Sequence, residues 1–256
     1  MKLRNEIVLV SGANRGLGRA LVQATLEAGA QRIYAGARDP AQLGEVLALA
    51  PDRIVPVALD ITDERSRLAA AARAPDVSVL FNNAGVLASY SVLASRREDL
   101  LRDFEVNCFG MLDMTTAFLP ALVRAGQRTT GNAVAAAVVN VLSITSICNM
   151  PAIGGYSASK SAAYSFTQAL RCELAPKHIA VHGVLAGAMD TDMVRAMDMP
   201  KTPPLEAARN IVHAVEQGEE DILPESASRG MFEVWRNDPR ELERTLAAAT
   251  KPPGPA

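Results

Sequence analysis

A short apolar run, a glycine-rich turn and a helical segment follow one another at the start of the chain. Residues 6–13 read EIVLVSGA, and glycines stand at Gly12, Gly16 and Gly18. Beyond the turn, side chains recur at helical spacing until Gly29 ends the helix: Leu17, Leu21, Val22, Thr25 and Leu26. Missing side chains let an anion approach the backbone of such a turn, and the helix N-terminus offers it unpaired N–H groups. This unit therefore predicts a cradle for the pyrophosphate of a dinucleotide.

Strand-like apolar runs alternate with helical segments along the rest of the chain. The runs are residues 7–10, 32–37, 54–59, 77–81, 137–143 and 180–185, with a short seventh strand expected at 221–224. This alternation predicts an α/β fold of three layers, in which a doubly wound parallel sheet lies between helices. Pro56 lies inside the third run, and proline is tolerated in a sheet mainly at an edge. The strand order 3-2-1-4-5-6 places the third strand at an edge, so the two observations agree.

The helices are expected between these runs, at residues 40–50, 63–73, 96–124, 155–176 and 203–218. Residues 126–135 form a longer connection than usual, which we interpret as a surface excursion. No internal repeat and no shift of composition divides the chain. One dinucleotide-binding catalytic domain is therefore expected over residues 1–250, followed by a disordered tail, KPPGPA, over residues 251–256.

The charge balance and the usage of cysteine and histidine exclude several classes of protein. The chain of 256 residues has 26 Lys and Arg against 28 Asp and Glu, with no basic tract, so nucleic acid is not an expected partner. Cys108, Cys148 and Cys172 are odd in number and widely spaced, which favours reduced thiols over disulfides. The histidines stand singly, so no metal site is expected. The longest apolar stretch, residues 133–142, is too short to span a bilayer, and no signal peptide is visible. We therefore expect a cytoplasmic protein without a membrane partner.

Tyr156 and Lys160, in the run YSASK, stand one helical turn apart, so their head groups share one face of the predicted helix. A tyrosine hydroxyl has an ordinary pKa of about 10, and a nearby positive charge favours its ionised form. The pair predicts a phenol that exchanges a proton near neutral pH, as making or breaking a ketone requires. An isolated pair of this kind is more often an exposed tyrosine beside a solvated lysine. The dinucleotide cradle favours the catalytic interpretation.

Taken together, these motifs resemble those of the short-chain dehydrogenase/reductase family, in its short single-domain branch. The glycines are spaced Gly-x-x-x-Gly-x-Gly, and NNAG at residues 82–85 resembles the motif that follows the fourth strand of the family. Asn107 in FEVNCFG, Ser143, and Tyr156 with Lys160 match its active-site residues. The resemblance covers residues 5–191 and thins to a general helix and strand pattern beyond. It implies a Rossmann fold and an oxidoreductase.

The resemblance also implies a role for each catalytic residue. Tyr156 would exchange the proton on the substrate oxygen, and Ser143 would hold that oxygen. Lys160 would lower the pKa of Tyr156 and bond the nicotinamide ribose. Asn107 would sit at a helix distortion and hold a water that links Lys160 to solvent. The residues alone leave two alternatives open: Asn107 as a buried amide bonded to backbone, and Ser143 as a structural serine at a strand end.

The second predicted strand ends in RIYAGARDP, which bears on the choice of cofactor. A fold that takes NAD generally offers a carboxylate to the adenosine ribose there, whereas NADP requires positive charge. Arg38 follows this strand and Arg15 lies in the glycine turn, so NADP is expected rather than NAD. The alternative is that Arg38 pairs with Asp39 and that Arg15 is merely solvated. Asp60 resembles the family aspartate that contacts adenine, and Thr62 is the expected N-cap of the following helix.

The residues expected to contact the cofactor come from the glycine turn, from three strand ends and from the catalytic helix. They are Gly12, Asn14, Arg15, Gly16, Leu17, Gly18, Arg38, Asp60, Ile61, Asn83, Ala84, Gly85, Tyr156, Lys160, Gly187, Met189 and Thr191. Two positions depart from the family pattern. Ala186 replaces the proline of the usual Pro-Gly after the sixth strand, and Ser11 replaces a threonine while keeping its hydroxyl.

The substrate is expected to be a small neutral, fairly apolar ketone or secondary alcohol. The segments that line the pocket in relatives carry apolar side chains here: Leu87, Ile144, Met150, Ile153, Met193, Met197 and Met199. Methionine adapts to irregular apolar shapes, although plain packing is an alternative. A non-catalytic dinucleotide-binding redox sensor is the competing function, but such proteins typically lack the tyrosine or the lysine. The glycine spacing and the short C-terminal part argue against an extended-branch epimerase or dehydratase. A homodimer or homotetramer is expected.

Overall fold

The computed structural model describes residues 1–129, 134–195 and 199–249, and seven parallel strands in them form one sheet in the order β3-β2-β1-β4-β5-β6-β7. The strands are β1 Ile7–Ser11, β2 Arg32–Ala37, β3 Ile54–Ala58, β4 Val79–Asn82, β5 Ala136–Val141, β6 Ile179–Val184 and β7 Asp221–Ile222. The predicted α/β class, the parallel sheet and the edge position of the strand with Pro56 are confirmed.

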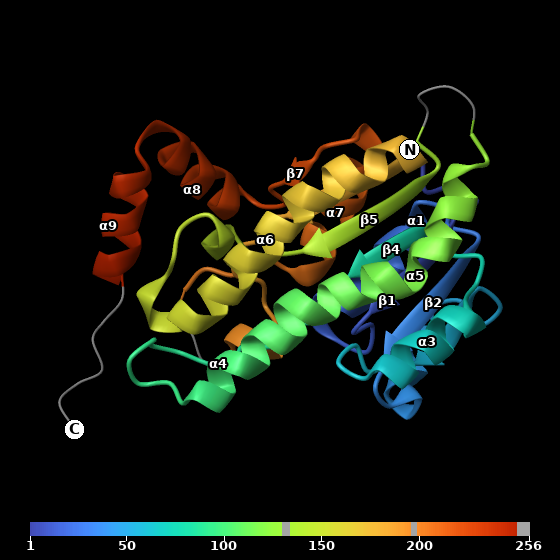
Figure 1. The fold of residues 1–256 in the computed structure, drawn as a ribbon, viewed down its shortest axis with the longest axis horizontal. Helices are drawn as coiled ribbons and strands as arrows, with labels where there is room; N and C mark the ends of the chain where they lie inside the picture. Colours follow the sequence, from blue (N-terminus) through green and yellow to red (C-terminus); the bar gives the residue numbers. More distant parts are fainter. Residues whose placement is uncertain (130–133, 196–198, 250–256) are drawn as a thin grey trace.

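The chain order reverses between β1 and β4, which are neighbours in the sheet (Figure 1). From β1 the chain proceeds outward to β2 and β3, and it then returns to β4 on the other side of β1. The loops that leave β1 and β4 therefore diverge, and a crevice opens at the carboxyl ends of these strands. This topology predicts a binding site at the carboxyl ends of the two strands.

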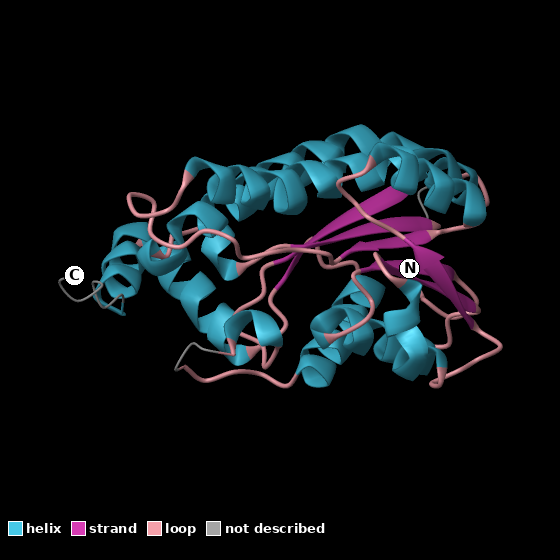
Figure 2. Cartoon of the chain, turned by 90° about the horizontal axis from the view of Figure 1, so that it is seen from below, coloured by secondary structure: helices cyan, strands magenta, loops and turns pink. Residues whose placement is uncertain are grey.

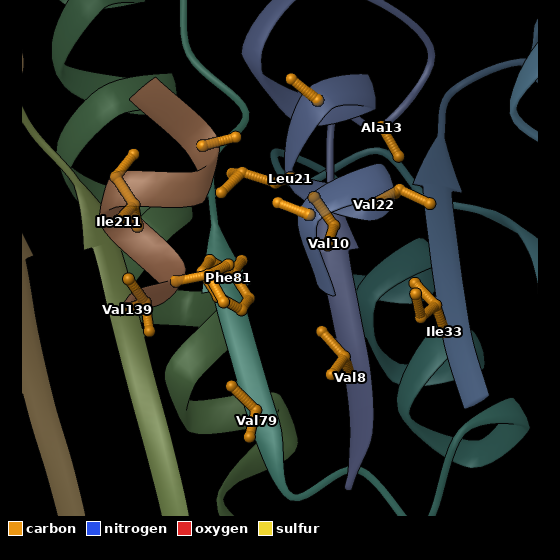
Figure 3. Close-up of a cluster of buried hydrophobic side chains, with 14 of the residues drawn as sticks. Val8, Val10, Ala13, Leu21, Val22, Ile33, Val79, Phe81, Val139 and Ile211 are labelled. Atoms are coloured by element: carbon orange, nitrogen blue, oxygen red, sulfur yellow. The ribbon is translucent and has the colours of Figure 1, made fainter. Parts of the chain in front are cut away.

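Helices cover both faces of the sheet, which Figure 2 shows edge-on between two helical layers. They are α1 Gly16–Glu27, α2 Gly44–Leu47, α3 Glu64–Arg73, α4 Arg97–Phe104, α5 Met111–Gly126, α6 Gly154–Leu174, α7 Pro204–Gln217, α8 Ser226–Asn237 and α9 Pro239–Ala249. On one face, Leu21 of α1 and Ile211 of α7 pack over Val10 and Phe81 of the central strands (Figure 3). The other face packs against α5 and α6 through a second buried cluster that includes Phe118 and Leu170. Both faces of the central strands are buried, which is why their sequences are nearly all apolar.

Several predicted helices differ from the observed ones in local detail. Residues 40–50 form a 3₁₀ turn, Pro40–Leu43, and one turn of α-helix, Gly44–Leu47. The predicted N-cap Thr62 is wrong: Asp63 caps α3 by accepting a hydrogen bond from the Ser66 N–H at 2.8 Å. Thr62 instead donates its hydroxyl to Asp60 at 2.7 Å. Asp63 caps the helix in preference to Thr62 because its carboxylate is a stronger acceptor for helix N–H groups.

The sequence predicted no helix beyond residue 218, yet α8 and α9 lie side by side at one end of the molecule (Figure 1). Each has a narrow apolar stripe, and the described side chains of α9 that are buried are Leu242 and Leu246. Phe232 and Trp235 pack with ring centroids 5.7 Å apart on α8. Short helices of this kind depend on tertiary packing more than on their own pattern. Residues 130–133, within the predicted excursion, and the predicted disordered tail at 251–256 lie outside the described residues.

The helical run Arg97–Gly126 is long and apolar enough to cross a membrane by length and composition alone. Half of its most apolar window is buried inside the molecule, as in the core helices of globular proteins. The absence of a membrane partner, the cytoplasmic location and the single domain over residues 1–250 therefore stay predictions.

Candidate active site

A cavity of about 1440 Å³ lies at the carboxyl ends of the central strands. Its walls come from the glycine turn, the ends of β2 to β6, α6 and the segment after β6. The predicted site residues on its walls are Gly12, Asn14, Arg15, Gly16, Leu17, Gly18, Arg38, Asp60, Ile61, Asn83, Ala84, Gly85, Ser143, Tyr156, Lys160, Gly187, Met189 and Thr191. The fold thus brings together residues that are spread over most of the chain.

The glycine turn makes the floor of this cavity because side chains are excluded from it. Gly12 has a φ of +66°, a conformation that favours glycine. A Cβ on Gly18 would collide with the Gly12 carbonyl oxygen. Ser11 ties the turn to the end of β4: its hydroxyl accepts hydrogen bonds from the N–H groups of Asn83 at 3.0 Å and Ala84 at 3.1 Å. The backbone is therefore bare and fixed where a pyrophosphate would lie, at the N-terminus of α1.

Tyr156, Lys160 and Ser143 lie together on the wall of this cavity. Tyr156 and Lys160 lie on one face of α6, with the lysine Nζ 5.8 Å from the centre of the tyrosine ring. Both side chains are buried, and Lys160 Nζ donates a hydrogen bond to the Val141 carbonyl oxygen at 2.8 Å. Ser143 follows β5 and accepts hydrogen bonds from the Thr145 N–H at 3.1 Å and the Thr145 hydroxyl at 3.0 Å. The serine therefore has a local capping role as well as its place on the cavity wall.

The pKa values of the pair correct one prediction. Burial raises the pKa of Tyr156 to about 12; a hydrogen bond with Ser143 opposes this rise, and the charge of Asp103 adds to it. Burial lowers the pKa of Lys160 to about 8. The prediction of a lowered pKa for Tyr156 is wrong for this structure, because desolvation has the largest effect on the phenol; the ammonium of Lys160 lies over the ring and is not among the groups that shift this pKa. The phenol is held as a proton donor.

Asn107 lies on a π-helical turn, Glu105–Gly110, that interrupts the run from α4 to α5. This is the helix distortion that the family resemblance implied. Its side chain is buried and bonds the backbone of Val86 in both directions, at 2.9 Å each, and donates to the Ser159 hydroxyl at 3.0 Å. The alternative of a buried amide bonded to backbone therefore describes the side chain. Asn107 is not among the residues of the cavity wall, and its link to a water stays a prediction.

The two predicted phosphate-binding arginines differ in their surroundings. Arg15 forms an ion pair with Asp192 at 3.0 Å, so it is not merely solvated. Arg38 lies near Asp60; burial raises the pKa of this carboxyl, but hydrogen bonds from Thr62 and the charges of Arg38 and Arg67 bring it below its ordinary value. Asp39 accepts a hydrogen bond from the Ala41 N–H at 3.0 Å, which is a local helix-capping contact.

The segment after β6 forms the remaining wall and depends on a residue that the sequence did not single out. Gly187 donates its N–H to the carboxylate of Glu225, which is buried at the start of α8. Burial raises the pKa of Glu225 above its ordinary range. The contact joins residues 38 positions apart, so no local pattern could have indicated it.

The apolar side chains that were expected to line the pocket do so wherever the structure describes them. Leu87, Ile144, Met150, Ile153, Met193 and Met199 line the cavity, and Met197 lies outside the described residues. Met231 of α8 and Leu246 of α9 add to this apolar part and were not predicted. Within the described ranges, no group of three or more His, Cys, Asp or Glu residues is placed to hold a metal ion.

Comparisons with known proteins agree with this geometry. The family model described as short chain dehydrogenase matches residues 6–201. The short chain dehydrogenase tazN of Aspergillus terreus is 34% identical over 185 residues, which cover 69% of this chain but only 40% of that protein. A crystal structure of a short chain dehydrogenase from Burkholderia cenocepacia in complex with NADP is 36% identical, with a TM-score of 0.87 over 96% of this chain and 99% of that one. A 3-ketoacyl-(acyl-carrier-protein) reductase from Brucella melitensis complexed with NADH is 25% identical, with a TM-score of 0.74 over 83% and 91% of the two chains.

Proposed function

The chain belongs to the short-chain dehydrogenase family, and on that premise we propose that it transfers a hydride between NADP(H) and a neutral, fairly apolar ketone or secondary alcohol. The observation that carries the proposal is the joint position of Ser143, Tyr156 and Lys160 on the wall of a cavity whose floor is the bare glycine turn. A dinucleotide laid on that floor would bring its reactive ring to the three side chains.

The proposed chemistry divides between the cofactor and the protein. The nicotinamide ring supplies or accepts the hydride. In the direction of reduction, the hydroxyls of Ser143 and Tyr156 hold the ketone oxygen, and Tyr156 gives that oxygen its proton as the carbon is reduced. The raised pKa of Tyr156 keeps this proton in place until negative charge develops on the substrate oxygen. Lys160 is an ammonium at neutral pH, since its pKa is about 8, and it would bind the cofactor ribose, as the family resemblance implies.

The choice of NADP over NAD is supported by charge at the end of β2. Arg38 lines the cavity there, and Arg15 of the glycine turn lines the same cavity while paired with Asp192. Arginine matches the geometry of a phosphate and remains charged at every physiological pH. The Burkholderia relative was crystallised with NADP, and the more distant Brucella relative was crystallised with NADH. The more similar protein and the local charge favour the same cofactor.

The apolar nature of the substrate is supported by the side chains around Ser143 and Tyr156. Ile144, Met150, Ile153, Met199 and Met231 form this part of the wall. The charged residues of the cavity other than Lys160 come from the glycine turn, from the ends of β2 and β3, from α4 and its π-turn, and from Asp192. Apart from Lys160, the cations on the wall are Arg15, Arg38 and Arg102 of α4, so we expect a substrate carboxylate or phosphate to find few cationic partners among these apolar side chains. No observation favours the alternative of a non-catalytic sensor, since the tyrosine and the lysine are both in place.

The decisive experiment is a panel of ketones and secondary alcohols, assayed with each of the four cofactors NADPH, NADH, NADP and NAD by nicotinamide absorbance. We expect turnover of uncharged apolar ketones with NADPH and weaker turnover of keto acids of the same size. A protein that binds NADPH but turns over no compound in the panel would contradict the enzymatic proposal and favour the sensor. A preference for keto acids would contradict the substrate class alone.

A further inference from the structure

Asp103 is a fully buried carboxylate on α4 that the proposed chemistry does not use. Its oxygens accept three hydrogen bonds, from the Ala88 N–H at 2.9 Å, the Ser89 N–H at 3.0 Å and the Ser89 hydroxyl at 2.5 Å. All three donors are neutral. A buried carboxylate is costly unless its oxygens are well bonded, and these bonds meet that need while leaving the negative charge uncancelled.

The segment that Asp103 holds is a wall of the cavity. Val86, Leu87 and Ala88 line it, and they lead directly into Ser89. Asn107, one helical turn beyond Asp103, binds the N–H and the carbonyl oxygen of Val86. Two side chains on one helical face thus hold the two ends of this wall, residues 86–89.

Ser89 links the wall to the start of α6. The serine is buried, and a Cβ on Gly155 would collide with its hydroxyl oxygen, so only glycine fits beside it. The Gly155 N–H also donates to the Tyr90 carbonyl oxygen at 3.4 Å. A continuous line of contacts therefore leads from Asp103 through Ser89 to Gly155, the residue before Tyr156.

The charge of Asp103 reaches both members of the catalytic pair. For Tyr156, the charge of Asp103 and burial both raise the pKa. For Lys160, the charge of Asp103 raises the pKa, but burial lowers it by more. Two other groups also shift these pKa values. A hydrogen bond with Ser143 lowers the pKa of Tyr156, and Cys108 of the π-turn raises the pKa of Lys160. Burial raises the pKa of the Cys108 thiol to about 11, so that thiol is neutral at physiological pH. Asp103 is therefore the anion that these two residues sense.

We propose that Asp103 is a positioning residue for the reaction: it fixes the wall 86–89 against the start of α6 and keeps one negative charge beside Tyr156 and Lys160. The wall then holds the substrate over the tyrosine. The charge keeps the phenol protonated and the ammonium charged, which are the forms needed to reduce a ketone. The inference rests on the proposed function, but its electrostatic half can be tested without any turnover.

The electrostatic test is an NMR titration of protein labelled with ¹³C in its lysine side chains, with the Lys160 resonance assigned from Lys160→Arg. In Asp103→Asn, the titration midpoint of Lys160 should fall by on the order of one pH unit, as expected for loss of one nearby charge in the interior. Asp99→Asn is the matched control, since Asp99 lies on the same helix and pairs with Arg96 on the surface. An unchanged Lys160 midpoint in Asp103→Asn would overturn the electrostatic half.

The positioning test uses Ser89→Ala, which keeps the charge of Asp103 and removes one of its three hydrogen bonds. We expect the KM for the ketone to rise several-fold while kcat changes less and the Lys160 midpoint stays where it is. Ser89→Ala decides the positioning half even if Asp103→Asn fails to fold. A KM equal to that of the wild type would overturn the positioning half. A wild type that turns over no ketone would contradict the proposed function and leave the titration to decide the electrostatic half.

Discussion

The proposed preference for NADP rests on Arg15 and Arg38, and these two side chains differ in the contacts they already make. Arg15 already forms an ion pair with Asp192, whose other carboxylate oxygen pairs with Arg195. Arg15 must give up that contact to reach a phosphate, so its net gain is smaller. Arg38 influences Asp60 only through its charge, and a phosphate would offer it a new charge-assisted contact.

Arg38→Ala should therefore weaken NADPH binding more than Arg15→Ala does. The loss of a hydrogen bond to a charged group is about 1.5–3 kcal/mol, which corresponds to roughly a tenfold to hundredfold increase in Kd. NADH lacks the phosphate, so its Kd should change little. Isothermal titration of both cofactors checks this. Equal losses for NADH and NADPH, or a wild type that prefers NADH, would refute the assignment.

Tyr156→Phe removes the proposed proton donor and keeps the ring. Turnover of a ketone should fall by about 10²–10⁴, the usual contribution of a general acid, while the Kd for NADPH stays close to that of the wild type. Tyr90→Phe is the matched control, because Tyr90 is 61% exposed and absent from the cavity wall. A Tyr156→Phe enzyme that retains most of its activity would rule out the proposed acid.

The site residues that could be predicted from the sequence are those that belong to short local motifs. The glycine turn, NNAG, Ser143, Tyr156 and Lys160 each stand in a recognisable local context, and the fold brings them to one cavity. Asp103 and Glu225 were not predicted, because their roles depend on contacts with segments distant in the sequence. The pKa of Tyr156 was predicted in the wrong direction, since burial is a property of the packed structure and not of the Tyr-x-x-x-Lys spacing.

At the scale of elements, the central strands were the most predictable part. Strands β1, β2 and β4 to β6 are apolar on both faces, so the predicted runs lie within two residues of the observed ends. The π-turn at Glu105–Gly110 has no signature in hydrophobic periodicity and was expected only from the resemblance. Helices α8 and α9 were missed because their narrow apolar stripes become informative only when both pack together.

Position 187 requires glycine because the backbone there packs against the Glu225 carboxylate at the start of α8. A Cβ there would lie 2.5 Å from the Glu225 carboxylate oxygen. Gly187→Ala should lower the free energy of unfolding by about 1–3 kcal/mol, the usual cost of overpacking, and should also raise the KM for cofactor because the loop must move. Gly230→Ala is the matched control within α8. It has no atom within 4 Å of the added Cβ, so a gain of about 0.5–1 kcal/mol is expected.

Urea unfolding of both variants at neutral pH measures the difference. Two equally stable variants would show that the loop relaxes around a new methyl group. The contact between Gly187 and Glu225 would then not hold the loop in place.

At the scale of the whole molecule, a buried histidine in the sheet makes the stability of the fold depend on pH. His182 of β6 is 2% exposed, and its Nδ1 bonds the Glu219 carbonyl oxygen. Burial lowers the pKa of His182 below its ordinary value of 6.5. The folded state therefore resists a proton that the unfolded chain accepts, so stability is lost as the pH falls below about 6.5.

We expect the free energy of unfolding to fall toward acid pH by up to about 1.4 kcal/mol per pH unit from this one group. Glu225 acts in the opposite sense, because its raised pKa costs stability as the pH rises above its ordinary value. The contributions of His182 and Glu225 are separated by measuring how steeply the free energy of unfolding changes between pH 7.5 and 5.5 in the wild type and in His182→Gln. His213→Gln, at an exposed position of α7, should keep the wild-type slope. A His182→Gln slope equal to that of the wild type would exclude His182 as the source.

The sheet also has an open side, and its chemistry affects how copies of the protein behave when crowded or partly unfolded. Edge strand β3 pairs with β2 through its odd-numbered residues: the Leu59 N–H donates to the Ala37 carbonyl oxygen at 2.8 Å, and the Arg53 carbonyl oxygen accepts from the Ile33 N–H at 2.9 Å. The backbone groups of the even-numbered residues therefore point away from the sheet. Pro56 is the central one of these, and it has no N–H to donate.

A strand from another molecule would thus find a missing donor in the middle of β3. The opposite edge is β7, which has only two residues. Exposed edges are where aggregation by β-pairing begins, and here one is interrupted by a proline and the other is too short to act as a template. The proline that marks β3 as an edge in the sequence also protects the folded protein from growing into fibres.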